Sequence, residues 1–274
     1  MTRIGIMQGR LLPPEAGRFQ SFPLTRWTAE FDYAAQVPLS YIEWIYDLYG
    51  AAVNPLTNHI EALEIISAGS RVAVRSLCAD YFMDRPFLRC SPAELCQREN
   101  LLHELLRLSA TVGIDHLVLP FVDASKIVTA EDRNTVVDVL KRVLPAARQA
   151  GVGLHLETCL APADFARLLD RIPDSLVKVT YDSGNSSSLG YAPAAEFSAY
   201  GARVGSVHIK DRILGGGTVP LGTGDADFPA VFNALAKVGY EGDITLQVAR
   251  CEAGNEVEWA RINRAFVAAY WPLG

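Results

Sequence analysis

Short apolar runs alternate with longer amphipathic segments from one end of the chain to the other, and this alternation constrains the fold more than any other feature. The apolar runs are rich in Val, Ile and Leu, which is typical of strands buried on both faces of a parallel sheet. They comprise residues 3–8, 41–45, 71–79, 116–120, 153–157, 177–182, 204–209 and 243–248. The pattern therefore predicts eight parallel strands.

The segments between these runs have the spacing of amphipathic helices and carry recognisable helix ends. Ser91 stands before Pro92, and Thr129 precedes two acidic residues, both of which favour a helix start. Glycines follow four segments, at positions 69, 113, 151 and 239, where a left-handed residue commonly ends a helix. The expected helices are residues 25–36, 56–68, 92–112, 130–150, 162–171, 192–200, 228–238 and 255–269.

A strict alternation of eight strands with eight helices is the pattern of a (β/α)8 barrel, and 274 residues is a usual length for one such domain. A doubly wound open sheet also alternates, but it usually has fewer strands. No GxGxxG motif follows the first apolar run, which removes the main support for a dinucleotide-binding sheet. The sequence thus predicts an α/β protein with one domain, a single TIM barrel over residues 1–274.

Charge and composition argue against several classes of function. The formal net charge is -6, which opposes nucleic-acid binding because phosphate backbones require a basic surface. No run approaches the ~18 apolar residues of a membrane span, and MTRIGIMQGR lacks the apolar core of a signal peptide. The five cysteines form no CxxC pair, as expected in a reducing compartment. We expect a cytoplasmic protein with a small-molecule partner and no nucleic-acid or membrane partner.

Polar side chains end four successive strands in the second half of the chain. They are Glu157, Asp182, His208 and Gln247. Each alone has a structural interpretation, as a loop cap, an ion-pair partner or a hydrogen-bonded core histidine. In a barrel, however, the C-terminal strand ends meet at one mouth, so the four groups should converge. Such a mixed oxygen and nitrogen set suits one divalent ion, Mn2+, Mg2+, Co2+ or Zn2+, and two close carboxylates repel each other without a cation.

The same strand ends lie in segments that resemble a known family. The chain resembles the sugar-phosphate isomerase/epimerase family of xylose-isomerase-like barrels in the segments QGRLLP, GLHLET, YDSGNSSSLGY, GSVHIKDR and VPLGTGDADFPAVFNALAKVGYEGDI. The resemblance is clearest over residues 151–249, and L-ribulose or L-xylulose 5-phosphate 3-epimerases and ketose 3-epimerases are the most similar groups. It implies a metal site formed by Glu157, Asp182, His208 and Gln247. Two positions depart from the family: Gln247 replaces a glutamate, and Asn185 replaces a histidine of many ketose epimerases.

The resemblance implies a metal-dependent isomerase or epimerase of a sugar, a sugar phosphate or a related keto-polyol. Such an enzyme removes a proton next to a carbonyl and forms a metal-bound enediolate. The catalytic candidates are Glu157, Gln247 and Lys210. Glu157 would be the base, and Lys210 would donate to a substrate oxygen or instead pair with Asp211. Gln247 can ligate a cation but cannot carry a proton, which favours proton transfer on one face, as in an aldose–ketose isomerase.

Substrate-binding candidates come from the same end of the predicted barrel. They are Arg10, Glu43, Asn185 and Arg250. Glu43 and Asp80 lie near the ends of the second and third strands, where either could be a second base. A structural role is favoured for Asp80. Aromatic residues near these two strand ends either line the mouth or belong to the core; they are Trp44, Tyr46, Tyr81 and Phe82.

Three other functions remain open. A lyase, such as a dehydratase acting on an inositol-type keto substrate, would begin with the same proton abstraction. An endonuclease IV-like phosphodiester hydrolase needs many histidine ligands, whereas we expect His59, His103 and His116 to lie away from the mouth. A sugar-binding barrel without proton chemistry would explain Gln247. The resemblance also suggests a homodimer or homotetramer as the assembly.

Overall fold

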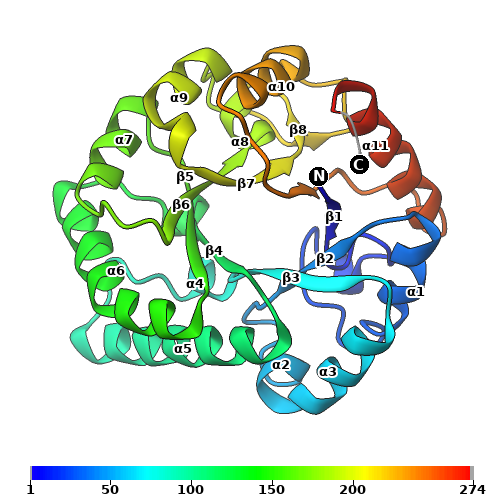
Figure 1. The fold of residues 1–274 in the computed structure, drawn as a ribbon, viewed down its shortest axis with the longest axis horizontal. Helices are drawn as coiled ribbons and strands as arrows, with labels where there is room; N and C mark the ends of the chain where they lie inside the picture. Colours follow the sequence, from blue (N-terminus) through cyan, green and yellow to red (C-terminus); the bar gives the residue numbers. More distant parts are fainter. Residues whose placement is uncertain (1, 272–274) are drawn as a thin grey trace.

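The computed structural model describes residues 2–271 and shows a closed barrel of eight parallel strands (Figure 1). Met1 and residues 272–274 of the predicted domain lie outside the described residues. Around the barrel the strands follow the order β1, β10, β7, β6, β5, β4, β3, β2. Their bounds are β1 Ile4–Met7, β2 Tyr41–Ile45, β3 Ala73–Cys78, β4 His116–Phe121, β5 Gly153–Thr158, β6 Val177–Asp182, β7 Val204–Ile209 and β10 Ile244–Leu246. The predicted fold class is confirmed.

A ring of helices surrounds the strands (Figure 1). The longer ones are α1 Ala29–Gln36, α3 Ile60–Gly69, α5 Pro92–Val112, α6 Ala130–Ala150, α7 Pro162–Asp170, α9 Pro193–Tyr200, α10 Phe228–Lys237 and α11 Glu256–Tyr270. The helix expected over residues 56–68 is divided into α2 Pro55–Asn58 and α3. The sequence pattern missed several short elements in the loops: η1 Glu15–Gly17, α4 Tyr81–Asp84, η2 Asp123–Ser125, α8 Ser183–Ser188, η3 Gly201–Arg203 and the antiparallel pair β8 Asp211–Arg212 and β9 Thr218–Val219. Such elements are too short to show a hydrophobic period.

Helix boundaries follow local chemistry closely. At the start of α5, the Ser91 hydroxyl accepts a hydrogen bond from the Glu94 backbone N–H, while the Glu94 carboxylate accepts one from the Ser91 backbone. This capping box satisfies two donors that a helix start leaves free. At the far end, Gly113 has a φ of 78°, a left-handed conformation that costs glycine little. Gly69 differs from the expectation because it is the last residue of α3.

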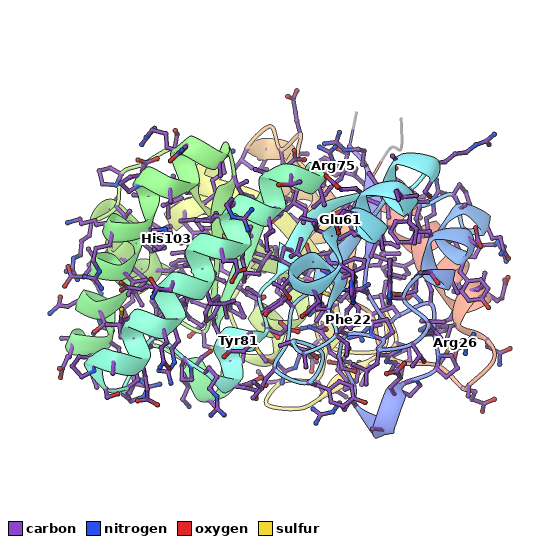
Figure 2. The ribbon with its side chains drawn as sticks, turned by 90° about the horizontal axis from the view of Figure 1, so that it is seen from below. Phe22, Arg26, Glu61, Arg75, Tyr81 and His103 are labelled. Atoms are coloured by element: carbon purple, nitrogen blue, oxygen red, sulfur yellow. The ribbon has the colours of Figure 1, made fainter. Side chains whose placement is uncertain are left out.

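The layer between strands and helices is apolar. Leu105 and Leu106 of α5 and Leu140 and Val143 of α6 are fully buried, and the two helices pack side by side (Figure 1). Each such side chain stabilises the fold by roughly 1.5–3 kcal/mol relative to an exposed position. His103 lies on the outer helix α5 (Figure 2), well away from the strand ends. Within residues 2–271, no helix combines the length and apolar character needed to cross a bilayer.

The barrel interior near the strand starts is filled with neutral polar side chains. The rings of His116 and His155 stack with centroids 3.9 Å apart, and His155 Nδ1 lies 2.8 Å from the Ser206 hydroxyl oxygen. Across the barrel, the Tyr41 and Thr245 hydroxyl oxygens are 2.8 Å apart. These contacts fill the base of the barrel, so we look for a small-molecule site at the opposite end, where the strands finish.

Candidate metal centre and active site

Three of the four predicted metal ligands converge at the C-terminal ends of neighbouring strands. Glu157 of β5, Asp182 of β6 and His208 of β7 are buried, and each offers one ligand atom within 4.8 Å of the others. His208 Nδ1 is 3.8 Å from Glu157 Oε2 and 4.0 Å from Asp182 Oδ2. The parallel register of β6 and β7 sets Asp182 directly beside His208. The strand arrangement thus builds a compact cluster of two carboxylates and one imidazole.

This cluster fits a divalent cation on chemical grounds. Ligands that each lie about 2.0–2.2 Å from one ion stand up to roughly 4.4 Å apart, which matches both separations from His208 Nδ1. Among the residues described, His208 Nδ1 has no hydrogen-bond partner. Burial, followed by the Asp182 charge, raises the pKa of Glu157 to about 7, because two buried carboxylates repel each other. A cation would relieve that repulsion, and the oxygen and nitrogen donors suit several divalent ions.

Glu43 lies beneath the cluster and contacts its histidine. Glu43 Oε1 is 2.8 Å from His208 Nε2, and the Ser76 hydroxyl donates to Glu43 Oε2 at 2.6 Å. Burial alone lowers the pKa of His208, but Glu43 and the two cluster carboxylates outweigh it and raise that pKa to about 9. A carboxylate on Nε2 turns Nδ1 toward Glu157 and Asp182, as in many metal sites.

Glu43 was expected to bind substrate, and that role stays a prediction. This residue is the middle one of β2, it has no exposed surface, and it does not line the cavity at the mouth. The sequence pattern found the unusual acid within an apolar strand. It could not reveal that the side chain reaches across the barrel to a histidine on β7.

Lys210 pairs with a cluster carboxylate. Its Nζ lies 2.8 Å from Asp182 Oδ2, whereas the Asp211 carboxylate accepts hydrogen bonds from the backbone N–H groups of residues 222, 224 and 226. The alternative of a Lys210–Asp211 pair is therefore wrong, because Asp211 turns toward the loop that follows β9. Asp182 Oδ1 accepts from the Asn185 backbone N–H at 2.8 Å and caps α8. Each oxygen of Asp182 thus has a fixed direction.

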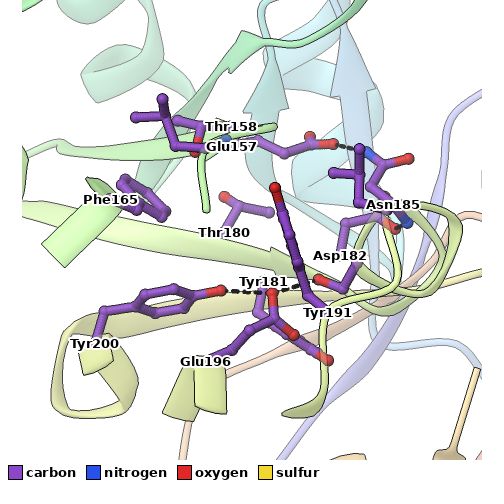
Figure 3. A pocket seen from close by; sticks show the side chains of 13 residues that line it. Glu157, Thr158, Phe165, Thr180, Tyr181, Asp182, Asn185, Tyr191, Glu196 and Tyr200 are labelled. Atoms are coloured by element: carbon purple, nitrogen blue, oxygen red, sulfur yellow. Dashed lines mark hydrogen bonds between the residues drawn. The ribbon is translucent and has the colours of Figure 1, made fainter. Parts of the chain in front are cut away.

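Asn185 connects the cluster to the loop after β7. Its amide nitrogen donates to Glu157 Oε1 (Figure 3), while its oxygen accepts from Lys210 Nζ at 3.3 Å and from Arg212 at 3.0 Å. Glu157 therefore has one carboxylate oxygen toward His208 and the other on Asn185. The sequence reasoning did not single out Arg212. The sequence shows only that Arg212 lies two residues after Lys210, just past the end of a strand.

Gln247, the fourth predicted ligand, forms its side-chain hydrogen bond to Gln20 and not to the cluster. Its amide nitrogen donates to Gln20 Oε1 at 3.0 Å, and Gln20 in turn donates to Asp80 Oδ2 at 2.7 Å. Gln247 Oε1 is buried and has no hydrogen-bond partner among the residues described. Gln20 belongs to the loop after β1, where no motif pointed to it. Its importance comes only from the distant residues that the barrel brings to it.

Arg10 and Arg250 hold the loop after β1 by its backbone. Arg10 donates to the carbonyl oxygens of Val248 and Phe19, and Arg250 donates to those of Phe19 and Leu12. Neither side chain lines the cavity at the mouth. In the structure both arginines thus anchor the loop after β1. Their expected contact with a substrate stays a prediction. Long side chains at a barrel mouth have several carbonyl oxygens in reach, and sequence does not show which one they bind.

A cavity of about 770 Å³ opens over the cluster. Ligand pockets of roughly 300–1,000 Å³ are usual for small molecules. Its polar lining includes Gln20, Asp80, Glu157, Asn185, Lys210, Arg212 and Gln247, and its apolar lining includes Phe19, Met83, Val122 and Ile127. None of the four aromatic candidates at the ends of β2 and β3 is among the described residues that line this cavity. Trp44 is fully buried and donates to Asn54 Oδ1 at 3.0 Å, so it belongs to the core.

Comparisons with known proteins agree with this architecture. Inosose dehydratases of Clostridium tetani and Clostridium perfringens are 27% and 26% identical to the chain over 173 residues, which is 54% of the chain and 58% of their length. The match therefore covers little more than half of these relatives. Among solved structures, the IolI protein with a bound zinc atom has a TM-score of 0.80 at 18% identity, covering 99% of this chain and 100% of its own. L-ribulose 3-epimerase has a TM-score of 0.79 at 18% identity, covering 98% and 94%.

The broadest agreement is with one protein family. Its sequence profile, described as xylose isomerase-like TIM barrel, matches residues 31–269, which include seven of the eight barrel strands and all of the residues in the metal cluster. The resemblance inferred from the strand-end segments is therefore confirmed. The chain belongs to the xylose isomerase-like TIM barrel family.

Proposed function

We propose that the chain is a divalent-metal-dependent isomerase or epimerase of a small polyhydroxylated carbonyl compound, such as a sugar, a sugar phosphate or a related keto-polyol. The observation that carries this proposal is the cluster of Glu157, Asp182 and His208, whose Glu157 lines a cavity large enough for a monosaccharide. A ketose-sized substrate offers adjacent carbonyl and hydroxyl oxygens, which are good ligands for a cation held by carboxylates and imidazole.

The residues in and around the cluster have separate roles in this reaction. A bound cation would act as a Lewis acid and acidify the C–H next to the substrate carbonyl. Glu157 removes that proton, because it lines the cavity and Asn185 fixes the direction of its carboxylate. Lys210 lines the same cavity and supplies a positive charge near the oxygen that becomes negative. Gln247 offers its free carbonyl oxygen as a ligand or hydrogen-bond acceptor.

Dehydration is the second candidate, and the similarity to inosose dehydratases favours it. A dehydratase would use the same first step, in which Glu157 takes a proton next to the carbonyl. It would then expel a neighbouring hydroxyl group as water. The two candidates differ in the mass of the product, which falls by one water molecule only in the dehydration.

Isotope exchange tests the shared first step. The protein loaded with Mn2+ is incubated in D2O with D-ribulose, D-xylulose, D-allulose, their phosphates and an inosose, and deuterium uptake at carbon is read by NMR. We expect exchange with at least one compound. We expect none for Glu157→Gln, whose amide oxygen still ligates a cation, so its metal content is measured in parallel. Unchanged exchange in that variant would remove Glu157 as the base, and binding of a sugar without exchange would indicate a binding protein.

A further inference from the structure

The cavity has an obvious base on one side and an amide on another. Glu157 lies at the end of β5, whereas Gln247 follows β10, and an amide side chain neither takes nor gives a proton under ordinary conditions. A reaction that inverts a carbon needs a proton carrier on each face of the substrate. Among the described residues that line this cavity, the acids besides Glu157 are Asp80 and Asp123. Asp123 is exposed, while Asp80 is buried with 7% of its surface accessible.

Asp80 is held by neutral donors only. Gln20 donates to its Oδ2 at 2.7 Å, and the Cys78 thiol donates to its Oδ1 at 3.1 Å. Among the ion pairs of residues 2–271, none involves Asp80, which contrasts with the pairing of Asp182 to Lys210. Burial raises the pKa of Asp80 above its usual value, so the acid form is favoured more than for an exposed aspartate.

The simplest structural role for Asp80 does not account for its position. Asp80 directly precedes the short helix α4, yet its side chain caps no backbone N–H there. Its carboxyl group instead turns to the cavity, where it meets Gln20. A buried acid that neither caps a helix nor pairs with a cation needs another reason to be there.

Gln20 forms hydrogen bonds both to Asp80 and to Gln247, which stands where the family has a glutamate. Its oxygen accepts from Gln247 at 3.0 Å and from Arg10 at 3.0 Å, so both acceptor directions are used. Its nitrogen is thereby turned to Asp80. In the order of the barrel strands, β3 and β10 flank β2 and β1, and β10 pairs with β7, which carries His208. Asp80, Gln20 and Gln247 line the same cavity as Glu157, so this hydrogen-bonded row and the proposed base face one shared space.

We propose that Asp80, just after β3, is the second proton-transferring residue of this site and performs the task that a glutamate at position 247 would perform. The proposal rests on the proposed function and narrows it to an epimerase. Glu157 takes the proton from carbon, and the C–H electron pair moves into the adjacent carbonyl to give an enediolate. Asp80 then gives its proton to the same carbon from the opposite face, and the carbonyl forms again. Glu157 is left protonated and Asp80 ionised, and exchange with water through the open cavity restores both.

The test separates proton removal from proton return. The wild type, Asp80→Asn and the double variant Asp80→Asn/Gln247→Glu are loaded with Mn2+ and given the ketose that the wild type exchanges fastest in D2O. For Asp80→Asn we expect epimer formation to fall at least 100-fold while exchange at the substrate carbon falls less than 10-fold. The added glutamate is expected to restore epimer formation at least 10-fold. Asp115→Asn, which removes an acid paired with Arg75 far from the cavity, is the matched control and should behave as wild type.

A second measurement needs no variant and therefore does not depend on the folding of Asp80→Asn. In a single turnover of wild-type protein, transfer by two residues gives an epimer whose hydrogen at that carbon comes entirely from solvent. Retention of the substrate's own hydrogen in the epimer would overturn the role of Asp80. Equal loss of exchange and epimer formation in Asp80→Asn, or loss of neither, would also overturn it and leave the proposed function standing. Absence of exchange in the wild type with every compound would overturn both.

Discussion

The two ends of the barrel both bury histidine rings, but they surround them in opposite ways. At the mouth, burial lowers the pKa of His208, yet three nearby carboxylates outweigh it and raise that pKa to about 9. At the base, burial lowers the pKa of His116 to about 4, although nearby carboxylates act in the opposite direction. Burial, followed by the stacked His116 ring, also lowers the pKa of His155. The two stacked rings at the base thus favour their neutral form, whereas the charged side chains at that end are paired with each other, as Asp243 is with Arg3 and Arg75.

This difference assigns stability mainly to the base of the barrel and metal binding mainly to its mouth. Buried carboxylates at the mouth repel each other unless a cation or the charge of Lys210 offsets them. This repulsion lowers the free energy of unfolding, and the same carboxylates favour the binding of an ion. The stacked histidines at the base make contacts that a cation would not improve. A change at the mouth should therefore alter metal binding first, and a change at the base should alter stability first.

The largest expected effect comes from replacing one histidine at each end by leucine. His208→Leu removes the nitrogen ligand, and we expect the affinity for Mn2+ or Zn2+ to fall by more than the roughly 10–100-fold loss usual for a supporting residue. It also leaves Glu43 buried without its partner. His155→Leu should keep the metal affinity within about twofold. Competition with a fluorescent chelator measures both, and comparable losses in the two variants would contradict the division between mouth and base.

The next effect concerns the pH dependence of stability. The folded-state pKa of His116 is about 4, below the usual 6.5 of a histidine, so between these two pH values the unfolded chain binds a proton that the folded chain does not. Stability from this residue is therefore complete above pH 6.5 and falls as the pH drops toward 4, by roughly 3 kcal/mol in all. His116→Phe keeps a ring for the stack but removes the titration. We measure the free energy of unfolding in urea from pH 7 to pH 4.5 and expect it to fall less for this variant than for wild type. An equal fall in both proteins would show that His116 is not held neutral at the base of the barrel.

A smaller effect is expected for the carboxylate beneath the cluster. Glu43→Gln keeps the shape of the side chain but removes the charge that turns His208 Nδ1 toward the metal site. We expect metal affinity to fall about 10–100-fold, the usual range for such partners. Glu104→Gln makes the same change on an exposed face of α5 and is the control, with no change expected. Equal affinity of both variants would show that Glu43 does not position the histidine.

Much of this architecture could be predicted from sequence because it depends on local patterns. The bounds of β2, β6 and β7 were predicted to the residue, since buried parallel strands appear as unbroken apolar runs. The strand ends at Glu157, Asp182 and His208 followed from the same runs.

The contacts that orient these groups could not be predicted in the same way. Gln20 and Gln247 are 227 positions apart, and only closure of the barrel brings them together. Glu43 was recognised as an unusual acid, but its partner on β7 lies across the barrel. Arg10 and Arg250 have the same chemistry whether they bind a substrate or a backbone carbonyl oxygen, so only coordinates separate the two roles.

The smallest expected effects come from replacing one glycine at the base and one at the mouth by alanine. Gly151 follows α6 at the base with a φ of 69° and open space around its Cα, so Gly151→Ala strains only the backbone. We expect it to lower the free energy of unfolding by about 1–2 kcal/mol and to leave isotope exchange unchanged. At the mouth, a Cβ on Gly184 would lie 2.7 Å from Cγ of Lys210, so Gly184→Ala must push the lysine stem away from Asp182. We expect this variant to slow exchange more than Gly151→Ala does, because Lys210 lines the cavity and is displaced. It should also lose stability, because Cβ of Lys210 lies 2.9 Å from the added atom and must move as well. If Gly151→Ala slowed exchange as much as Gly184→Ala, the two ends of the barrel would be coupled, and the separation of folding at the base from chemistry at the mouth would fail.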